Sequence, residues 1–289
     1  MIETNEFYKS IITNQIGSKA KLNAAEPVTG GCINKGVKLS TSDGIYFIKW
    51  NAHVGDMFEK EARGLKILQN VEIMTIPKTI GFGTIDTKDY LMLEFLNRES
   101  MTTDYWTDFG HKLAGLHRCS KENFGLDHDN YIGSLPQSNR SSSTWVEFFI
   151  NQRLRVQLTL AKNGNNIPSQ LLQSFDKLIQ KIPDWLPEEQ PALLHGDLWS
   201  GNVMVGSDGK VCLIDPAVYY GHPEIELAFT TLFGGFDQSF YHAYNEEFPL
   251  AQGYEDRFDI YNLYPLLVHV NLFGSSYLSG IQTTLDRFT

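Results

Sequence analysis

The amino-acid sequence predicts an α+β protein in which an antiparallel sheet lobe precedes a mainly helical lobe. Three observations support this fold class: strand patterns between residues 25 and 96, helical patterns from about residue 104 onward, and a change between the two near 94–97. We expect residues 1–96 to form the first lobe and residues 97–289 the second, with a cleft between them. With 289 residues, 42% of them hydrophobic, the chain has enough apolar surface for a sizeable core.

The first lobe is predicted to contain a hairpin, one helix and a further strand. Apolar segments at 37–39 and 46–49 flank the turn Ser42-Asp43-Gly44, which is typical of a hairpin. The apolar residues of 56–70 recur at helical spacing. The segment 90–95 is another apolar strand, and it leads directly into the expected hinge.

The second lobe is predicted to be helical apart from one short hairpin. Apolar residues line one helical face of 106–116, and the segments 145–160 and 171–182 are further helices. A turn rich in Gly, Ser and Asp separates two short strands within 202–214. The polar run 139–144 is expected to be a surface loop.

Composition and charge exclude several classes of partner. The formal net charge of −10 argues against nucleic acid, which is bound chiefly through clustered Lys and Arg. We expect no membrane partner, because no window approaches the roughly 20 apolar residues of a membrane span, and no secretory signal at the N-terminus. Cys32, Cys119 and Cys212 fit neither a disulfide framework nor a zinc site, so a reducing, cytoplasmic location is expected.

The strongest functional signal is the run 195–202 (HGDLWSGN), followed after the hairpin by 214–216 (IDP). In the catalytic loop of protein kinases an Asp precedes an Asn by five residues, and a metal-binding Asp follows on the next strand. Asp197 and Asn202 have that separation, and Asp215 ends the strand that leaves the hairpin. The sequence therefore predicts a bilobal, protein-kinase-like fold.

These groups suit phosphoryl transfer from ATP. The reaction needs a hydroxyl placed in line, a carboxylate that accepts its proton, and magnesium to neutralise charge on the phosphates. Asp197 is the expected base, while Asn202 and Asp215 offer the hard oxygen ligands that Mg²⁺ prefers. The alternative is that these are ordinary turn residues, but three groups at kinase order and spacing make it the weaker interpretation.

Lys49 and Glu61 form a second candidate pair, in the first lobe. Lys49 ends the strand 46–49, where a kinase keeps the lysine that contacts the α- and β-phosphates. Glu61 shares the apolar helix stripe of Phe58 and Leu65, so it is expected to face inward. A carboxylate that faces inward needs a cation, and Lys49 is the natural one. The alternative is a partly exposed glutamate at the edge of the stripe.

The run 29–36 (TGGCINKG) lies ahead of Lys49 and is predicted to cover the phosphates. It matches neither the Walker A sequence nor G-x-G-x-x-G, so the prediction depends on its position. Adjacent glycines allow backbone N–H groups to approach phosphate oxygens closely. The backbone of 94–96 is expected to bind adenine. The residues predicted at the nucleotide, besides Lys49 and Glu61, are Gly30, Gly31, Cys32, Ile33, Asn34, Glu94, Phe95 and Leu96.

A long regulated activation segment has no room in this chain. Only ten residues separate Asp215 from Glu226, and Pro216 stands where protein kinases carry the Phe of Asp-Phe-Gly. A kinase that phosphorylates proteins under phosphorylation control is therefore disfavoured, and a small hydroxyl-bearing acceptor is expected.

Six segments together carry a resemblance to a known family, namely 30–33, 58–68, 195–202, 214–217, 219–228 and 233–236. The His-Gly-Asp and Ile-Asp elements are shared by small-molecule kinases in general, whereas the segments 219–228 and 233–236 discriminate best. Over about residues 5–288 the sequence resembles the fructosamine kinases, also called ketosamine 3-kinases, which are relatives of aminoglycoside and choline kinases.

The resemblance implies ATP- and magnesium-dependent phosphorylation of the C3 hydroxyl of a ketosamine, a small or protein-bound glycated amine. In that family the 3-phosphate destabilises the adduct and frees the amine, which is a deglycation and protein-repair function. The resemblance also implies that His195 supports the catalytic loop and that Trp199, Tyr219 and Tyr220 lie at the substrate. The identity of the sugar and of the amine carrier stays open.

The glycine-rich loop agrees with the family at one position and departs from it at another. Family members carry a cysteine there, and some are thought to use it as a redox switch. Cys32 matches, which implies a redox-dependent homodimer, with an unreactive small residue as the alternative. Asn34 stands where many relatives have Ser, so a phosphate-contacting hydroxyl is lost there or replaced by the amide.

Two other functions remain open from the sequence. The first is a kinase for another small alcohol, such as an aminoglycoside, choline or a sugar. The second is an ATP-binding pseudokinase, which predicts the loss of a catalytic group. That loss is not seen, because Lys49, Glu61, Asp197, Asn202 and Asp215 are all present.

Overall fold

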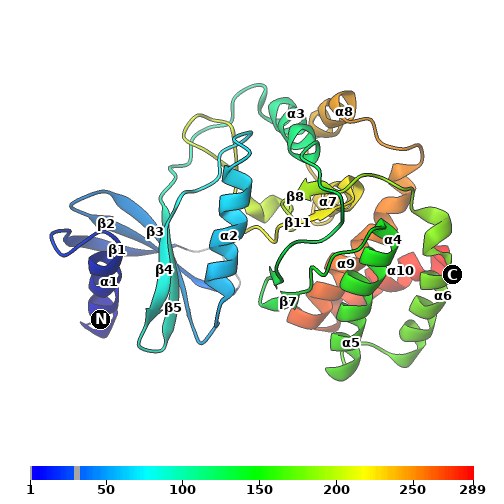
Figure 1. The fold of residues 1–289 in the computed structure, drawn as a ribbon, viewed down its shortest axis with the longest axis horizontal. Coiled ribbons are helices and arrows are strands. Elements are labelled where there is room, and N and C mark those ends of the chain that lie inside the picture. Colours follow the sequence, from blue (N-terminus) through cyan, green and yellow to red (C-terminus); the bar gives the residue numbers. More distant parts are fainter. Residues whose placement is uncertain (1, 29–32) are drawn as a thin grey trace. The chain divides into compact units, whose positions relative to one another are not determined.

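The computed structural model describes residues 2–28 and 33–289, and its backbone divides into two compact units (Figure 1). The first unit combines the residues up to Thr102 with Met204–Asp215, and the second combines Thr103–Val203 with Pro216–Thr289. An antiparallel sheet in the first unit and a mainly helical second unit confirm the predicted α+β fold class.

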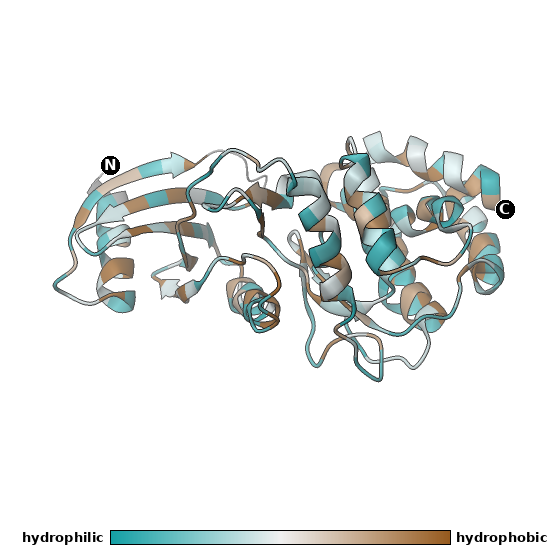
Figure 2. Ribbon diagram, turned by 90° about the horizontal axis from the view of Figure 1, so that it is seen from above, coloured by the Kyte–Doolittle hydropathy of each residue, from teal (hydrophilic) through white to brown (hydrophobic). Residues whose placement is uncertain are grey.

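The first unit is built on a five-stranded antiparallel sheet. Hydrophobic and hydrophilic residues are interspersed along its strands (Figure 2), and burial alternates along the strand Lys35–Thr41, as expected where one face of a sheet lies on a core. The predicted hairpin is confirmed, and Gly44 in its turn takes a φ of +150°, which favours glycine. In sheet order the strands are β1 (Leu22–Val28), β2 (Lys35–Thr41), β3 (Ile45–Ala52), β5 (Lys88–Glu94) and β4 (Thr79–Ile85).

Within the described part of the first unit, two helices accompany the sheet. The predicted helix at 56–70 is confirmed as α2 (Met57–Gln69), and Phe58 and Leu65 are among its buried residues. The helix α1 (Ile2–Gln15) was not predicted. Its buried side chains pack with strand residues of the sheet in one cluster, and their spacing is the helical signal that could have revealed it. The buried α1 residues are Phe7, Tyr8, Ile11 and Ile12.

The second unit is mainly helical, as predicted. Short strands pair as β8 (Ala192–Leu194) with β11 (Tyr219–Gly221) and as β6 (Asn130–Ile132) with β7 (Leu135–Gln137). The predicted hairpin is formed by β9 (Val203–Val205) and β10 (Val211–Leu213), but Met204–Asp215 belongs to the first unit rather than to the second. The longer helices are α3 (Tyr105–His117), α5 (Arg155–Asn163), α6 (Ser169–Trp185), α7 (Pro223–Thr231), α8 (Gln238–Glu247), α9 (Tyr254–Phe273) and α10 (Leu278–Phe288).

The helix predicted at 145–160 is confirmed as one unbroken helical run, but its winding is not uniform. It begins as α4 (Trp145–Phe148), continues as a π-helix at Phe149–Leu154 and only then becomes α5. Arg153, in the π-helical turn, is fully buried and lies 3.9 Å over the ring of Tyr219. The wider turn of a π-helix leaves no trace in a simple hydrophobic pattern, so periodicity could not predict it.

The prediction of a surface loop at 139–144 is partly wrong. Asn139 is fully buried and Ser142 is 8% exposed. The Asn139 amide donates to Asn130 Oδ1 at 2.9 Å, and its own Oδ1 accepts from Arg153 Nη2 at 2.8 Å. A polar run can therefore be internal when buried partners satisfy its hydrogen bonds.

Candidate active site

Lys49 lies between two carboxylates in the first unit. Its Nζ donates to both carboxylate oxygens of Glu61, at 2.8 and 3.0 Å, and to Asp215 Oδ1 at 2.9 Å. The ion pair predicted between β3 and α2 is therefore confirmed, whereas the direct contact between Lys49 and Asp215 was not predicted. Asp215 follows β10, which is fixed to the same unit by the Leu213 N–H that donates to the carbonyl of Thr75.

Burial and the neighbouring carboxylates shift the pKa of Lys49 in opposite directions. Burial lowers the pKa of Lys49, but the Asp215 and Glu61 carboxylates outweigh it and raise the pKa above 10.5. Only 9% of the Lys49 side chain and 12% of the Glu61 side chain are exposed, against 40% for Asp215. The lysine is therefore a fixed cation, and Asp215 is the carboxylate that solvent or a ligand can reach.

The backbone of Asp215 has an uncommon conformation. Its φ of +55° lies in the left-handed region, which few residues other than glycine adopt. Such outliers concentrate at functional sites, where surrounding structure holds them. The β10 strand before Asp215 and the chain after it supply that restraint here: Gln137 Nε2 donates to the carbonyl of Ala217, and Asn130 Nδ2 to that of Val218.

Asp197 and Asn202 contact each other in the second unit. The Asn202 amide donates to Asp197 twice, to the Oδ2 atom of its carboxylate and to its backbone carbonyl, both at 2.8 Å. The Asn202 N–H also donates to the carbonyl of Trp199, which closes the loop. The five-residue spacing therefore allows the Asn202 amide nitrogen to hold the carboxylate of Asp197 in one orientation.

Glu226 of α7 anchors the start of this loop. Its carboxylate accepts the backbone N–H of His195 at 3.0 Å and that of Gly196 at 2.6 Å. Gly196 has a φ of +84°, and a Cβ there would stand 2.0 Å from the carbonyl oxygen of Ala217. Only glycine fits this close approach. The role of Glu226 was not predicted, although the residue lies within the motif at 219–228.

A buried network holds Glu226 in its ionised form. His117 Nε2 donates to Glu226 Oε2 at 3.1 Å, and His117 Nδ1 lies 2.7 Å from the Tyr244 hydroxyl. Burial raises the pKa of Glu226, but His117, His195 and the Gly196 N–H outweigh it, and the net pKa is below the usual value. Burial raises the pKa of Tyr244 well above 10, so its hydroxyl keeps the proton and can donate to His117.

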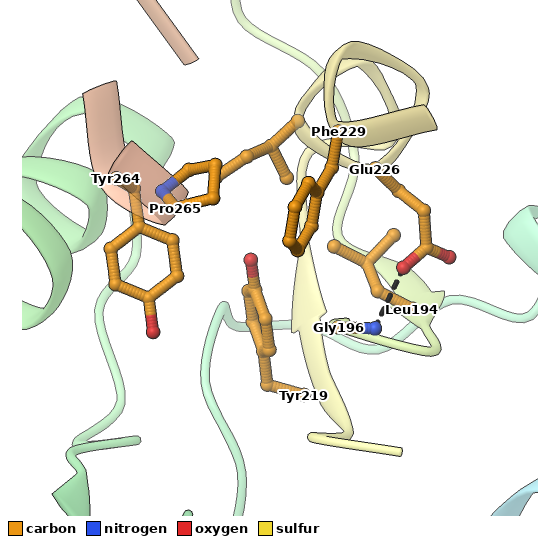
Figure 3. Close-up of a pocket in the computed structure, with 8 residues that line it drawn as sticks. Leu194, Gly196, Tyr219, Glu226, Phe229, Tyr264 and Pro265 are labelled. Atoms are coloured by element: carbon orange, nitrogen blue, oxygen red, sulfur yellow. Dashed lines mark hydrogen bonds between the residues drawn. The ribbon is translucent and has the colours of Figure 1, made fainter. Parts of the chain in front are cut away.

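A small cavity lies behind the loop, lined by Glu226 and Gly196 together with apolar side chains (Figure 3). Its volume of about 10 Å³ is at the lower limit for one water molecule. Tyr219 and Tyr264 also line it. The cavity is too small for a substrate, so it belongs to the support of the loop rather than to an acceptor site.

Trp199 and Tyr219 differ in their surroundings. Trp199 is partly exposed, and its ring lies over Gly201, where a Cβ would stand 2.3 Å from it. Tyr219 is 1% exposed beneath Arg153, and Tyr220 is 9% exposed with Lys121 over its ring. Packing accounts for both tyrosines, and their contact with substrate stays a prediction.

Part of the predicted nucleotide site falls outside the described residues, namely Gly30, Gly31 and Cys32. Next to them, Asn51 Nδ2 donates to the carbonyl of Ile33 at 3.1 Å and to Asn34 Oδ1 at 3.2 Å. Asn34, the departure from the family pattern, thus has a structural partner of its own.

The expected adenine-binding segment follows directly from β5. Glu94 Oε1 accepts the N–H of Lys78, which ties the side chain to the segment before β4. Glu94, Phe95 and Leu96 are all half-buried.

The structure therefore brings the predicted residues together in two groups, one in each unit. Lys49, Glu61 and Asp215 form the first, and Asp197 and Asn202 form the second. Among the described residues, no cluster of three or more His, Cys, Asp or Glu is suited to a metal. None of the described helices combines the length and hydrophobicity of a membrane span.

The chain is similar in sequence to curated relatives over almost its whole length. Residues 5–289 match the family model described as fructosamine kinase. The chain is 38% identical over 281 residues to a protein named probable ketoamine kinase from Synechocystis, covering 96% of this chain and 94% of that protein. It is 37% identical over 278 residues to the chloroplastic protein-ribulosamine 3-kinase of Arabidopsis thaliana, covering 94% and 84%.

Solved structures give the same result. A candidate fructosamine-3-kinase from Haemophilus somnus superposes with a TM-score of 0.86 at 29% identity, covering 97% of this chain and 96% of the other. A spectinomycin phosphotransferase shares the fold alone, with a TM-score of 0.60 at 16% identity over 98% and 91% of the two chains. The chain therefore belongs to the fructosamine kinase family.

Proposed function

We propose that this protein is an ATP-dependent kinase that phosphorylates the C3 hydroxyl of a ketosamine of the fructosamine or ribulosamine type. Its family membership makes it a phosphotransferase with an alcohol group as acceptor. The relative named protein-ribulosamine 3-kinase supports both the glycated acceptor and the C3 position. The observation that carries the site assignment is Lys49, which lies 2.8 Å from Glu61 and 2.9 Å from Asp215.

In this proposal Asp197 is the general base. It accepts the proton of the acceptor hydroxyl as the new oxygen–phosphorus bond forms and the bond from the γ-phosphorus to the β,γ-bridging oxygen breaks, which releases ADP. Asn202 keeps the Asp197 carboxylate oriented through its 2.8 Å hydrogen bond. Lys49 contacts the α- and β-phosphates, and Glu61 holds it in place.

Asn202 and Asp215 are the residues that would hold Mg²⁺. Their side chains supply an amide oxygen and a partly exposed carboxylate, which are hard ligands. Magnesium keeps several waters and uses few protein groups alongside phosphate, so two protein ligands suffice. When bound, the ion neutralises charge on the phosphates.

We propose the following division of labour between the lobes. Residues 1–96 bind ATP, residues 97–289 bind the acceptor, and the hinge lies near 94–97, where the backbone binds adenine. Gly30, Gly31 and the loop around them cover the phosphates. Breakdown of the 3-phosphate would then free the amine, a deglycation and repair role that fits a cytoplasmic enzyme.

A panel of acceptors tests the proposed function. We expect ADP release that depends on a fructosamine or ribulosamine, with no comparable release on aminoglycosides, choline or free sugars. Nuclear magnetic resonance of the product should place the phosphate on C3. Turnover on another alcohol, with none on any glycated amine, would contradict the proposal.

We propose in addition that Cys32 forms a reversible disulfide between two chains. Its place in the glycine-rich loop and the family resemblance support this, and Cys212, 0% exposed, is an internal control. A dimer that disappears with reductant should form on mild oxidation of the wild type and of Cys212→Ser, but not of Cys32→Ser. Identical migration of all three with and without reductant would contradict it.

A further inference from the structure

A cluster of aromatic side chains extends from the catalytic loop to the helices at the C-terminus. The ring of Trp199 meets that of Phe233 edge-on, with 6.0 Å between centroids. Phe233 lies 4.8 Å from His269 and 6.4 Å from Tyr277, and the latter two rings are 4.9 Å apart. We call Trp199, Phe233, His269 and Tyr277 the aromatic cluster. All four residues belong to the second unit.

The cluster offers aromatic surface to solvent rather than to the core. Phe233 is 43% exposed, and each of the other three members is partly exposed. The backbone of Phe233 has a φ of +59°, which is rare for a bulky residue, and the next two residues, Gly234 and Gly235, continue the turn at +110° and +74°. This turn keeps a large ring at the surface, where the ring gains little stabilisation from burial.

The cluster starts beside the proposed base. Trp199 follows Asp197 by two residues, and its N–H donates to the Asp197 carbonyl at 3.2 Å. The close contact of the Trp199 ring with Gly201 leaves the ring little freedom to move. Trp199 is thus the cluster member that lies next to the proposed base in the chain.

The cluster is also electrically neutral. Burial lowers the pKa of His269, although the Pro265 carbonyl, which accepts from its Nδ1 at 2.7 Å, opposes the shift. His269 is thus a neutral ring with a lone pair on Nε2. The negative faces of neutral aromatic rings attract cations within about 6 Å of the centroid.

We infer that the aromatic cluster binds the protonated amine of the ketosamine and so selects acceptors with a cationic nitrogen next to the sugar. The inference rests on the proposed function and deepens it. In a ketosamine only a carbonyl carbon and a methylene separate C3 from the nitrogen. In this inference the ammonium lies beside the rings of Trp199 and Phe233 when the C3 hydroxyl lies at Asp197. A sugar without the amine would lack this contact.

Two acceptors that differ only in charge test the inference. One is a fructosamine with a secondary amine, and the other is its N-acetyl derivative, which is neutral. We expect Phe233→Leu to raise KM for the cationic acceptor by about 2- to 30-fold while leaving KM for the neutral one unchanged. Phe233→Tyr keeps an aromatic face and should retain the wild-type KM for both.

Phe82→Leu is the matched control, because Phe82 on β4 is also 43% exposed but lies in the first unit. It should leave both KM values unchanged. If Phe233→Leu does not fold, as judged by circular dichroism, Tyr277→Leu replaces it in the same comparison. An equal rise of KM for both acceptors, or no rise for either, would overturn the inference.

Failure of the proposed function can be told apart from failure of this inference. If the wild type phosphorylates neither acceptor, the proposed function fails. A ligand-observed resonance titration with N-methylpropylammonium still reports amine binding in that case. We expect Phe233→Leu to weaken it and Phe82→Leu to leave it unchanged, and equal behaviour of the two variants would overturn the inference.

Discussion

At the scale of single residues, Lys49 joins side chains that lie far apart in the sequence. Its buried Nζ contacts Glu61, 12 residues away in sequence, at 2.8 Å, and Asp215, 166 residues away, at 2.9 Å. The sequence predicted the Glu61 contact, because a carboxylate on an apolar helix stripe requires a cation. It could not predict the Asp215 contact, because that depends on where β10 docks in the folded chain.

Glu226 is the residue whose role the sequence concealed. Two glutamates follow each other at alternate positions in α7, and nothing in the pattern separates Glu224, which pairs with Arg257, from Glu226, which holds the loop. Both side chains are buried, although charged residues on a helix usually face solvent. The charges alone would therefore have suggested an exposed helix face. Only the partners of each carboxylate distinguish a packing role from a positioning role.

Replacing Glu226 with Gln should loosen the catalytic loop. One carboxylate now accepts from His195 N, Gly196 N and His117 Nε2, and an amide with a single oxygen cannot satisfy all three. Hydrogen bonds to a charged group are worth about 1.5–3 kcal/mol each. We expect kcat to fall by about tenfold or more, with the KM for ATP nearly unchanged.

The control for this change is Glu246→Gln, whose side chain is 76% exposed. That variant should match the wild type in both kcat and KM. A fall in kcat common to both variants, or a parallel rise in the KM for ATP in Glu226→Gln, would contradict the positioning role.

At the scale of elements, the start of α7 fixes the position of Glu226. His222 is the N-cap residue, and its Nδ1 accepts the N–H of Glu224 at 3.1 Å. Pro223 follows at the first position of the helix, where a missing N–H costs nothing. The cap fixes the start of the helix, and Glu226 reaches the catalytic loop from its first turn.

The same cap makes stability depend on pH. Burial, Arg257 and His117 lower the pKa of His222 to about 3 in the folded protein. In the unfolded chain its pKa is about 6.5. Because the folded pKa is lower, the contribution to stability is present above pH 6.5 and is lost as the pH falls toward 3. The slope reaches at most about 1.4 kcal/mol per pH unit.

His222→Asn tests this dependence, since Asn can also cap a helix but does not titrate. Urea unfolding of both proteins between pH 7 and 4 should give a free energy of unfolding that falls more steeply with acidity in the wild type. Parallel curves for the two proteins would contradict a buried, neutral His222.

Elements with strong local signals were predicted, and those defined by long-range partners were not. The hairpin around Gly44 and the helix α2 carry turn residues and helical spacing, so both were found. The helix α1 was missed because its apolar residues form a short stripe between polar ones. Asn139 was wrongly predicted to lie at the surface, because the local pattern does not reveal its buried partners Asn130 and Arg153, which are 9 and 14 residues away.

On the scale of the whole molecule, the residues of the proposed site are distributed over two compact units. The first holds Lys49, Glu61 and Asp215, and the second holds Asp197 and Asn202. The net charge of −10 serves solubility first, and it also attracts cationic acceptors mildly at long range. This agrees with an amine-bearing acceptor and with an aromatic cluster that binds its ammonium.

The proposal as a whole depends on Asp197 acting as the base in a phosphoryl transfer. The most direct test is Asp197→Asn, assayed for ketosamine-dependent ADP release and for ATP binding. Asparagine is similar in size but accepts a proton poorly, so we expect turnover to fall by about 10²- to 10⁴-fold while ATP binds as in the wild type. Unchanged turnover in Asp197→Asn would contradict the account.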